Sequence, residues 1–270
     1  VRADCFYKGA FIMNYIGIDI GSTCAKTVVL NEKKELILEF VQPTGWSSVD
    51  TAEEIRQKLE FAGINLSNES SHCVATGYGR ISVPYADKTV TEITCHALGA
   101  VHLFQHPDLT VIDIGGQDTK IIQIEQGFVK DFIMNDKCAA GTGRFLEVMA
   151  NTLSLRPNEM FDLARLGSDT TISSMCTVFA ESEVIGLIGK GEPKENIAYA
   201  VVNSTIRKVA AQVSRMNGEM FTFCLTGGLC ECDYIREALS KELGKDVFSC
   251  PDARYAGAIG AALSAMKIRK

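Results

Sequence analysis

The sequence predicts an α/β protein built from two similar halves, each with a mixed sheet flanked by helices. The first observation is a repeat: IGIDIGSTCAKTVVL (residues 16–30) and VIDIGGQDTKIIQI (residues 111–124) each join two apolar strands through a glycine turn. Both copies contain Asp-Ile-Gly followed at the same spacing by lysine, and they are offset by 94 residues. A repeat of this length indicates duplicated α/β halves rather than a solenoid. The second observation is FTFCLTGGLCECDYIREAL (residues 221–239), which is typical of a strand, a turn and a helix.

Composition narrows the class of protein. The chain has 270 residues, of which 46% are apolar and 22% charged, as is ordinary for a soluble globular protein. A net charge of -6 without a basic stripe disfavours nucleic acid as a partner. No apolar run reaches the length of a membrane span, so we expect no membrane partner. Ten cysteines without a signal peptide indicate a cytoplasmic protein, whose surplus thiols fill the core, bind metal or react. Cys73, Cys95 and Cys224 are predicted core residues.

The two glycine turns of the repeat are candidate phosphate sites. A turn of small residues exposes backbone N–H groups to phosphate oxygens, and an aspartate at the strand end suits a metal-bound water. Either hairpin alone is equally well explained as an ordinary glycine turn, but the matched pair favours phosphate. Downstream, Gly227 and Gly228 would let the chain lie flat against a nucleotide base or ribose.

A cysteine precedes each of two predicted helices. In NDKCAAGTGRFLEVMA (residues 135–150), Cys138 stands before a helix that begins near Thr142. Apolar residues share one side of that helix at spacings of three and four: Phe145, Leu146, Met149 and Leu153. In ISSMCTVFAESEVIGLIGKG (residues 172–191), Cys176 precedes a helix with Val184, Ile185 and Ile188 on its apolar side.

A thiolate or an anionic cluster would be stabilised at such helix N-termini. Zinc and iron–sulfur sites normally take four ligands, and one chain offers two of this kind. Two chains that each give Cys138 and Cys176 would complete a four-thiolate site on a two-fold axis. The alternative is two buried small cysteines. Cys230 and Cys232 form a CxC pair whose role stays open.

Together, the two hairpins, the Thr-Gly-Gly turn and the final helix rich in glycine and alanine resemble the actin, sugar-kinase and heat-shock chaperone ATPase superfamily. The resemblance implies two actin-like (ribonuclease H-like) domains with ATP and Mg²⁺ in the interdomain cleft. It implies a first phosphate loop of Asp19, Gly21, Ser22 and Thr23, and a second of Asp113, Gly115, Gly116, Gln117 and Asp118. Gly227 and Gly228 would flank the adenosine.

Roles for the polar residues of these loops follow from the same resemblance. Asp19 and Asp113 would hold Mg²⁺, mainly through water, and either Gln117 or Asp118 would position the attacking water. Lys26 and Lys120 pair with these acids or with phosphate, unless they are solvated strand lysines.

The expected domain boundaries are as follows. Residues 1–12 are a disordered tail or a spurious extension of the reading frame. Residues 13–105 form the first domain, and the C-terminal helix at about 251–270 packs back on it. Residues 106–250 form the second domain and carry the cluster cysteines.

Longer segments resemble the activator component (activase, component A) of the 2-hydroxyacyl-CoA dehydratases. They are NDKCAAGTGRFLEVMA, SSMCTVFAESE, TGYGR (residues 76–80), ADKTVTEITCHALGA (residues 86–100) and VIDIGGQDTK. The resemblance implies a homodimer with one [4Fe–4S] cluster, ligated by Cys138 and Cys176 of each chain. It also implies an anaerobic electron-transfer role: one electron comes from reduced ferredoxin or flavodoxin, and ATP binding and hydrolysis to ADP drive it to the dehydratase.

Three other functions remain open at the level of sequence. One is a related ATP-driven electron-transfer subunit of the benzoyl-CoA reductase type. Another is a small-molecule kinase, such as a sugar kinase, of the same fold. The third is a nucleotide-gated scaffold that uses zinc for structure.

Overall fold

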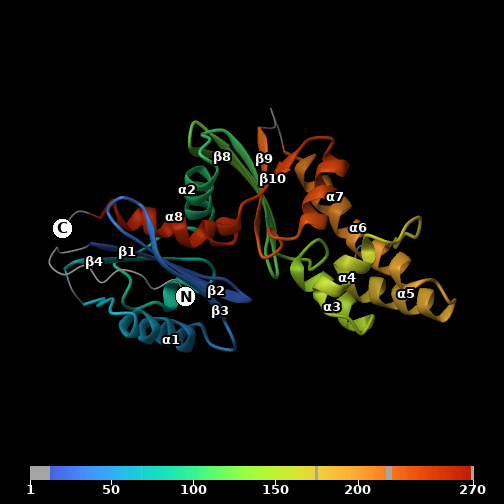
Figure 1. Cartoon of the computed structure of the whole chain (residues 1–270), viewed down its shortest axis with the longest axis horizontal. Helices are drawn as coiled ribbons and strands as arrows, with labels where there is room; N and C mark the ends of the chain where they lie inside the picture. The colour runs from blue at the N-terminus through green and yellow to red at the C-terminus, as the bar shows by residue number, and fades with distance from the viewer. Residues whose placement is uncertain (1–12, 68, 174–175, 217–220, 269–270) are drawn as a thin grey trace. The chain divides into compact units, whose positions relative to one another are not determined.

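The chain divides into two compact units in the computed structural model (Figure 1), which describes residues 13–67, 69–173, 176–216 and 221–268. The first unit takes in Val1–Pro107, Gln126–Val129 and Tyr255–Lys270, and the second takes in Asp108–Glu125 and Lys130–Arg254. The tail or extension predicted at residues 1–12 lies outside the described residues.

The first unit contains a five-stranded mixed sheet in the order β3-β2-β1-β4-β5. Strands β1, β2 and β3 are antiparallel neighbours, whereas β1, β4 and β5 are parallel. The strands are β1 (Asn14–Ile20), β2 (Cys24–Leu30), β3 (Leu36–Pro43), β4 (Ser71–Thr76) and β5 (Lys88–Thr89). The helices are α1 (Ser48–Phe61), η1 (Arg80–Ser82), α2 (Glu92–Phe104) and α8 (Ala256–Ala265).

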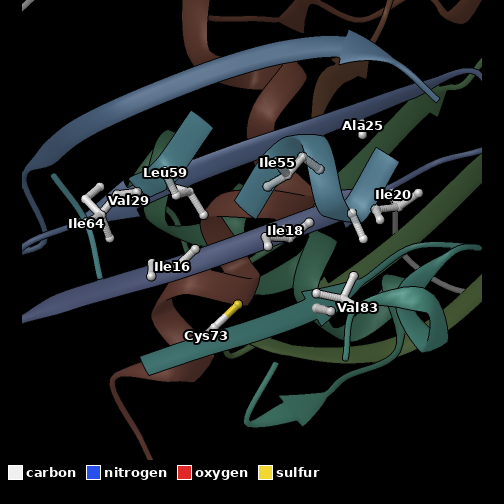
Figure 2. Packing of buried hydrophobic residues seen from close by; sticks show 12 residues of the cluster. Ile16, Ile18, Ile20, Ala25, Val29, Ile55, Leu59, Ile64, Cys73 and Val83 are labelled. Atoms are coloured by element: carbon white, nitrogen blue, oxygen red, sulfur yellow. The ribbon is translucent and has the colours of Figure 1, made fainter. Parts of the chain in front are cut away.

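One face of this sheet packs against α1. Alternate side chains of β1, namely Ile16, Ile18 and Ile20, join Ile55 and Leu59 of α1 in a buried cluster (Figure 2). The alternation follows from the two-residue period of a strand, which sends these isoleucines to a single face. Burial of this apolar surface fixes the register of β1 and therefore the position of its last residues.

The other face of β1 lies against α8. A Cβ atom at Gly17 would clash with the carbonyl oxygen of Ala258, so glycine is required for this approach. Helix α8 also crosses α2 closely, because Gly99 and Gly260 each lie against a backbone carbonyl of the other helix. The glycines and alanines of α8 thus serve close backbone packing inside the first unit.

The second unit contains a five-stranded mixed sheet in the order β10-β9-β6-β7-β8. Strands β6 and β7 are antiparallel, and β6, β9 and β10 are parallel. The strands are β6 (Leu109–Ile114), β7 (Thr119–Glu125), β8 (Phe128–Asn135), β9 (Thr222–Gly227) and β10 (Val247–Phe248). The helices are α3 (Gly143–Thr152), α4 (Pro157–Ala164), α5 (Thr177–Gly189), α6 (Lys194–Val213), α7 (Asp233–Leu243) and η2 (Pro251–Tyr255).

These elements confirm the predicted α/β class with two mixed sheets flanked by helices. Both predicted hairpins form, and a strand–turn–helix follows at β9 and α7. Helix α3 begins at Gly143 with Thr142 as its N-cap, and all four predicted apolar residues of its inner side are buried. No helix in the described part of the chain combines the length and apolar character that a membrane crossing requires.

Candidate nucleotide and thiol sites

The first hairpin places Asp19 and Lys26 opposite each other. They are register partners on β1 and β2, and Lys26 Nζ lies 4.0 Å from Asp19 Oδ2. The turn is closed by the Gly21 amide, which donates to the Cys24 carbonyl at 3.1 Å. Ser22 and Thr23 are exposed at the tip of this turn. The backbone of the turn is therefore open to solvent, while the carboxylate behind it is buried.

Two glycines make room for the Asp19 carboxylate. A Cβ atom at Gly77 or at Gly257 would clash with its oxygen atoms. Gly77 also has a φ of +84°, which side chains strongly disfavour. Sequence reasoning did not assign Gly77 or Gly257 to this site. The Thr-Gly pair that ends β4 was an available signal, because the same pair ends β9.

The second hairpin has the same plan with a tighter ion pair. Asp113 and Lys120 are register partners on β6 and β7, and Lys120 Nζ lies 3.2 Å from Asp113 Oδ2. The same ammonium group lies 2.9 Å from Asp118 Oδ2. Thr226, opposite Asp113 on β9, donates to Asp113 Oδ1 at 3.3 Å. Lys120 is 1% exposed, so this lysine is a buried member of the site and not a solvated strand residue.

The turn of the second hairpin separates Gln117 from Asp118. The Gly115 amide donates to the Asp118 carbonyl at 2.9 Å and closes the turn, as Gly21 does in the first hairpin. The Asp118 side chain is held by Lys120, whereas the Gln117 side chain is exposed. Of the two residues, Gln117 therefore has the side chain that is available to solvent.

Gly227 and Gly228 lie at the end of β9, where they were expected, but they differ in their surroundings. Gly227 has a φ of +83°, and a Cβ atom there would lie 2.6 Å from Asp113 Oδ1. Gly228 donates to the Ile114 carbonyl at 3.2 Å, and a Cβ atom there would meet nothing within 4 Å. Gly227 thus makes room for the aspartate, as Gly77 does in the first unit. Gly228 has open space where a side chain would lie.

Cys138 lies in a turn in which four successive carbonyl groups accept hydrogen bonds. Asn135 Nδ2 donates to the carbonyls of Cys138 at 2.8 Å and of Ala140 at 3.1 Å. Thr142 donates to Ala139 through both its amide and its hydroxyl. The Gly141 carbonyl accepts from the Thr119 hydroxyl at 2.6 Å. The Cys138 side chain itself is half-buried.

Cys176 is the N-cap residue of α5 and is exposed. Its side chain makes no capping hydrogen bond to the helix. The chain before it is anchored at Ser173, whose amide donates to both carboxylate oxygens of Glu183 at 3.0 Å. A second acid of α5, Glu181, accepts from Thr152 of α3 at 3.1 Å. The two acids of this helix thus hold neighbouring segments in place.

The face of α5 is only partly as predicted. Val184 is buried, but Ile185 and Ile188 are exposed, so the apolar residues do not share one inner side. Val178 and Phe179 in the first turn are exposed as well. An exposed apolar helix face of this kind is typical of an interaction surface.

The predicted core cysteines are buried in the structure. Burial raises the pKa of Cys224 to about 12 and that of Cys95 to about 11, and it raises the pKa of Cys73 strongly as well. Burial also raises the pKa of Cys230 to about 11. Burial thus disfavours the thiolate form of these cysteines, which is the form that binds metals. Within the described ranges, no group of three or more His, Cys, Asp and Glu side chains is placed to hold a metal ion.

Comparison with known proteins gives matches along nearly the whole chain. The model of the BadF/BadG/BcrA/BcrD ATPase family matches residues 16–265. The (R)-2-hydroxyglutaryl-CoA dehydratase activating ATPase of Acidaminococcus fermentans is 43% identical over 93% of this chain and 96% of its own. The activator of lactoyl-CoA dehydratase from Anaerotignum propionicum is 40% identical over 94% and 97%. A benzoyl-CoA reductase subunit from Thauera aromatica is 30% identical over 92% and 91%.

Solved structures agree with these matches. The activator of the 2-hydroxyisocaproyl-CoA dehydratase from Clostridium difficile, solved with bound ADPNP, has a TM-score of 0.85 at 34% identity and covers 94% of each chain. A ROK family glucokinase from Streptomyces griseus has a TM-score of 0.56 at 16% identity, over 93% of this chain and 98% of its own, and shows likeness of fold alone. The findings confirm the predicted family resemblance, the actin-like fold and the ATP-hydrolase class.

Proposed function

The chain belongs to the BadF/BadG/BcrA/BcrD ATPase family, and from that premise we propose that it is the ATP-hydrolysing activator of a 2-hydroxyacyl-CoA dehydratase. In this role it passes a low-potential electron from reduced ferredoxin or flavodoxin to the dehydratase component. The observation that carries the proposal is a pair of thiols, half-buried Cys138 and exposed Cys176, each preceding a helix in the unit that also holds the Asp113 hairpin. A kinase of this fold has no need for such a pair.

ATP hydrolysis rests on the two hairpins. The amides of the exposed residues Ser22 and Thr23, and that of Gly116 in the second turn, bind phosphate oxygens. The Asp113 oxygens already accept from Lys120 and Thr226, so this carboxylate fits Mg²⁺ through a bound water better than by direct ligation. Mg²⁺ would neutralise charge that develops on the phosphates. Gln117 positions the attacking water, and Asp118 fixes Lys120 beside it.

The residues present also fit a [4Fe–4S] cluster. Cys138 is half-buried and Cys176 is exposed, and Cys176 stands at a helix N-terminus whose dipole favours a thiolate ligand. When bound, the cluster would supply a one-electron relay. Two thiols of each chain complete the four-thiolate set only when a second copy contributes its own pair.

The exposed face of α5 supports such a homodimer. Val178, Phe179 and Ile185 present apolar side chains to solvent directly after Cys176. A Cβ atom at Gly186 or Gly189 would meet nothing within 4 Å, so a second helix has room to approach closely there. Burial of this face by an identical α5 would bring the two Cys176 residues towards one two-fold axis.

The runner-up is an ATP-driven subunit for another acceptor of the benzoyl-CoA reductase type. The higher identity to dehydratase activators, 43% and 40% against 30%, favours the dehydratase. In this role the chain does not bind the acyl-CoA substrate of its partner, so its sequence does not identify that substrate.

The test is to purify the chain without oxygen and to measure iron, acid-labile sulfide and mass in solution. We expect a dimer with about four irons and four sulfides per two chains. Cys176→Ala should lose the iron, while Cys232→Ala should retain it. Cys232 is a matched control because it is also the N-cap residue of a helix, α7. A monomer that stays free of iron after anaerobic reconstitution would contradict the proposal.

A dehydratase assay then separates the activator from its runner-up. The reconstituted dimer, ATP and a reduced ferredoxin are added to an inactive 2-hydroxyacyl-CoA dehydratase component. Dehydration that requires all three supports the activator role. If the iron-loaded protein activates a benzoyl-CoA reductase core but does not activate a dehydratase, the result supports the runner-up.

A further inference from the structure

The turn of the second hairpin is hydrogen-bonded directly to the segment that carries Cys138. The amide of Gly143 donates to the Gly115 carbonyl at 2.9 Å, and the amide of Arg144 donates to the Gly116 carbonyl at 2.7 Å. Both donors belong to the first turn of α3, which continues from the Cys138 segment. Two carbonyls of the phosphate-binding turn are thereby tied to the start of that helix.

A third connection comes from Thr119, the first residue of β7. Its hydroxyl donates to the Gly141 carbonyl at 2.6 Å, and the Thr119 side chain is completely buried. Thr119 directly follows Asp118, so its backbone adjoins the phosphate-binding turn while its side chain contacts the Cys138 segment.

The backbone carbonyl groups of the Cys138 segment are all hydrogen-bonded. Every carbonyl from Cys138 to Gly141 accepts a hydrogen bond, from Asn135, Thr142 or Thr119. A segment without free carbonyl groups has little freedom to adjust internally. A displacement of the β6–β7 turn would therefore reach Cys138 through hydrogen-bonded backbone.

We propose that Thr119 is a positioning residue that couples the phosphate-binding turn to Cys138. Its hydroxyl keeps the Cys138 segment in register with the turn, so that exchange of ADP for ATP changes the surroundings of the thiol. This inference rests on the proposed function, since it requires a nucleotide at the β6–β7 turn. It supplies the contact through which nucleotide state and thiol site act on each other, and such coupling is reciprocal.

The test follows alkylation of Cys138 by iodoacetamide in the metal-free full-length chain, with the modified peptide quantified by mass spectrometry. The rate is measured with saturating Mg²⁺–ADP and with saturating Mg²⁺–ADPNP, and calorimetry establishes that each nucleotide is bound. We expect the two rates to differ by at least about fivefold in the parent chain, the lower end of typical allosteric coupling. Because the metal-free protein is used, the result does not depend on activity.

Four variants test whether Thr119 and the Cys138 segment carry the coupling. Thr119→Val keeps the shape but removes the hydroxyl, and we expect the ratio of the two rates to fall towards one while both nucleotides still bind. Thr119→Ser should restore the ratio. Asn135→Ala loosens the Cys138 segment without touching the nucleotide turn, and should also reduce the ratio. Thr27→Val is the control, because Thr27 is a fully buried threonine of β2 whose hydroxyl has no hydrogen-bond partner among the described residues.

The outcomes separate the inference from the proposed function. Equal rates in the parent chain, with both nucleotides bound, would overturn the coupling and leave the ATPase role intact. A Thr119→Val chain with the parental ratio would overturn the role of the hydroxyl. If Thr119→Val does not fold, a parental ratio in Asn135→Ala would overturn the inference. If neither nucleotide binds the parent chain, the proposed function and this inference both fail.

Discussion

The two strand-end aspartates have the same neighbours in sequence but different surroundings. In the first unit, Lys26 lies 4.0 Å from a single carboxylate, and 19% of its side chain is exposed. In the second unit, Lys120 is buried between Asp113 and Asp118 at 3.2 and 2.9 Å. The repeated hairpin thus carries a partly exposed ion pair in one unit and a buried lysine between two carboxylates in the other. The copy with the buried lysine is the one that is hydrogen-bonded to the cysteine-bearing segment.

The supports behind the two turns differ in the same way. The first turn is held by Thr44, which donates through its amide to Thr23 and through its hydroxyl to Gly21. The second is held by the first turn of α3. The hairpin turn is therefore supported by a loop residue in the first unit. In the second unit it is supported by the helix that follows the Cys138 segment.

The largest difference should appear when each lysine is removed. Lys120→Met leaves two carboxylates without their buried cation, and we expect a loss of about 3–5 kcal/mol in the free energy of unfolding. Lys26→Met removes a partly exposed pair and should cost less than about 1 kcal/mol. Urea unfolding of both variants measures this. Equal losses would mean that the two hairpins are energetically alike.

The exposed phenylalanines of the two units should differ in their effect on assembly. Phe179 on α5 is 68% exposed and Phe61 on α1 is 96% exposed. If α5 forms the dimer interface, Phe179→Glu should weaken association by about 2 kcal/mol or more, as for a hot-spot residue. Phe61→Glu should leave the dimer intact. Analytical ultracentrifugation measures the mass of each variant in solution. If Phe179→Glu has the same mass as the parent dimer, the interface lies elsewhere.

A smaller effect is expected at the glycines, where the two units should behave alike. Gly77→Ala and Gly227→Ala each place a methyl group against an aspartate at a φ near +84°. We expect each to cost about 1–3 kcal/mol of stability through strain. Gly228→Ala has free space and should change stability by less than about 0.5 kcal/mol. Thermal unfolding of the three variants would expose any asymmetry between Gly77 and Gly227.

The smallest effect concerns one buried thiol in each unit. Burial raises the pKa values of Cys95 and Cys230 to about 11, from 9.0 for a free thiol. Above pH 9 the unfolded chain therefore releases protons that the folded chain retains, and stability falls as pH rises from about 9 towards 11. Cys95→Ala and Cys230→Ala should each reduce the loss between pH 8 and 9.5 by up to about 1 kcal/mol. The midpoints of urea unfolding at the two pH values test this. If only one variant shows a smaller loss of stability, the two buried thiols differ in their effect.

Much of the fold could be predicted from local patterns. The hairpins were identified because Asp-Ile-Gly and the following lysine keep the same spacing in both copies. The start of α3 followed from helical periodicity after Gly141. A search for equal spacing could not reveal the role of Gly77. Helices α3 to α6 precede β9, so the two Thr-Gly pairs are further apart in the sequence than the two hairpins are.

The face of α5 shows another limit of sequence reasoning. Periodicity groups Val184 with Ile185 and Ile188 as apolar, yet it contains no information on whether an apolar residue packs inside its own chain or against another one. The structure separates Val184 from the other two. The hydrogen bond of Thr119 to Gly141 was equally invisible, since it joins residues 22 positions apart through tertiary structure.

The glycine-mediated contact of α8 with β1 and α2 has a consequence for synthesis on the ribosome. The strands of the first unit are translated before the second unit, but the helix that covers one face of β1, α8, is translated after it. The nascent first unit must wait with that apolar face uncovered until the second unit has been made. The first unit therefore starts before the second unit but is completed only after it, and its uncovered sheet is the surface that a chaperone would have to protect.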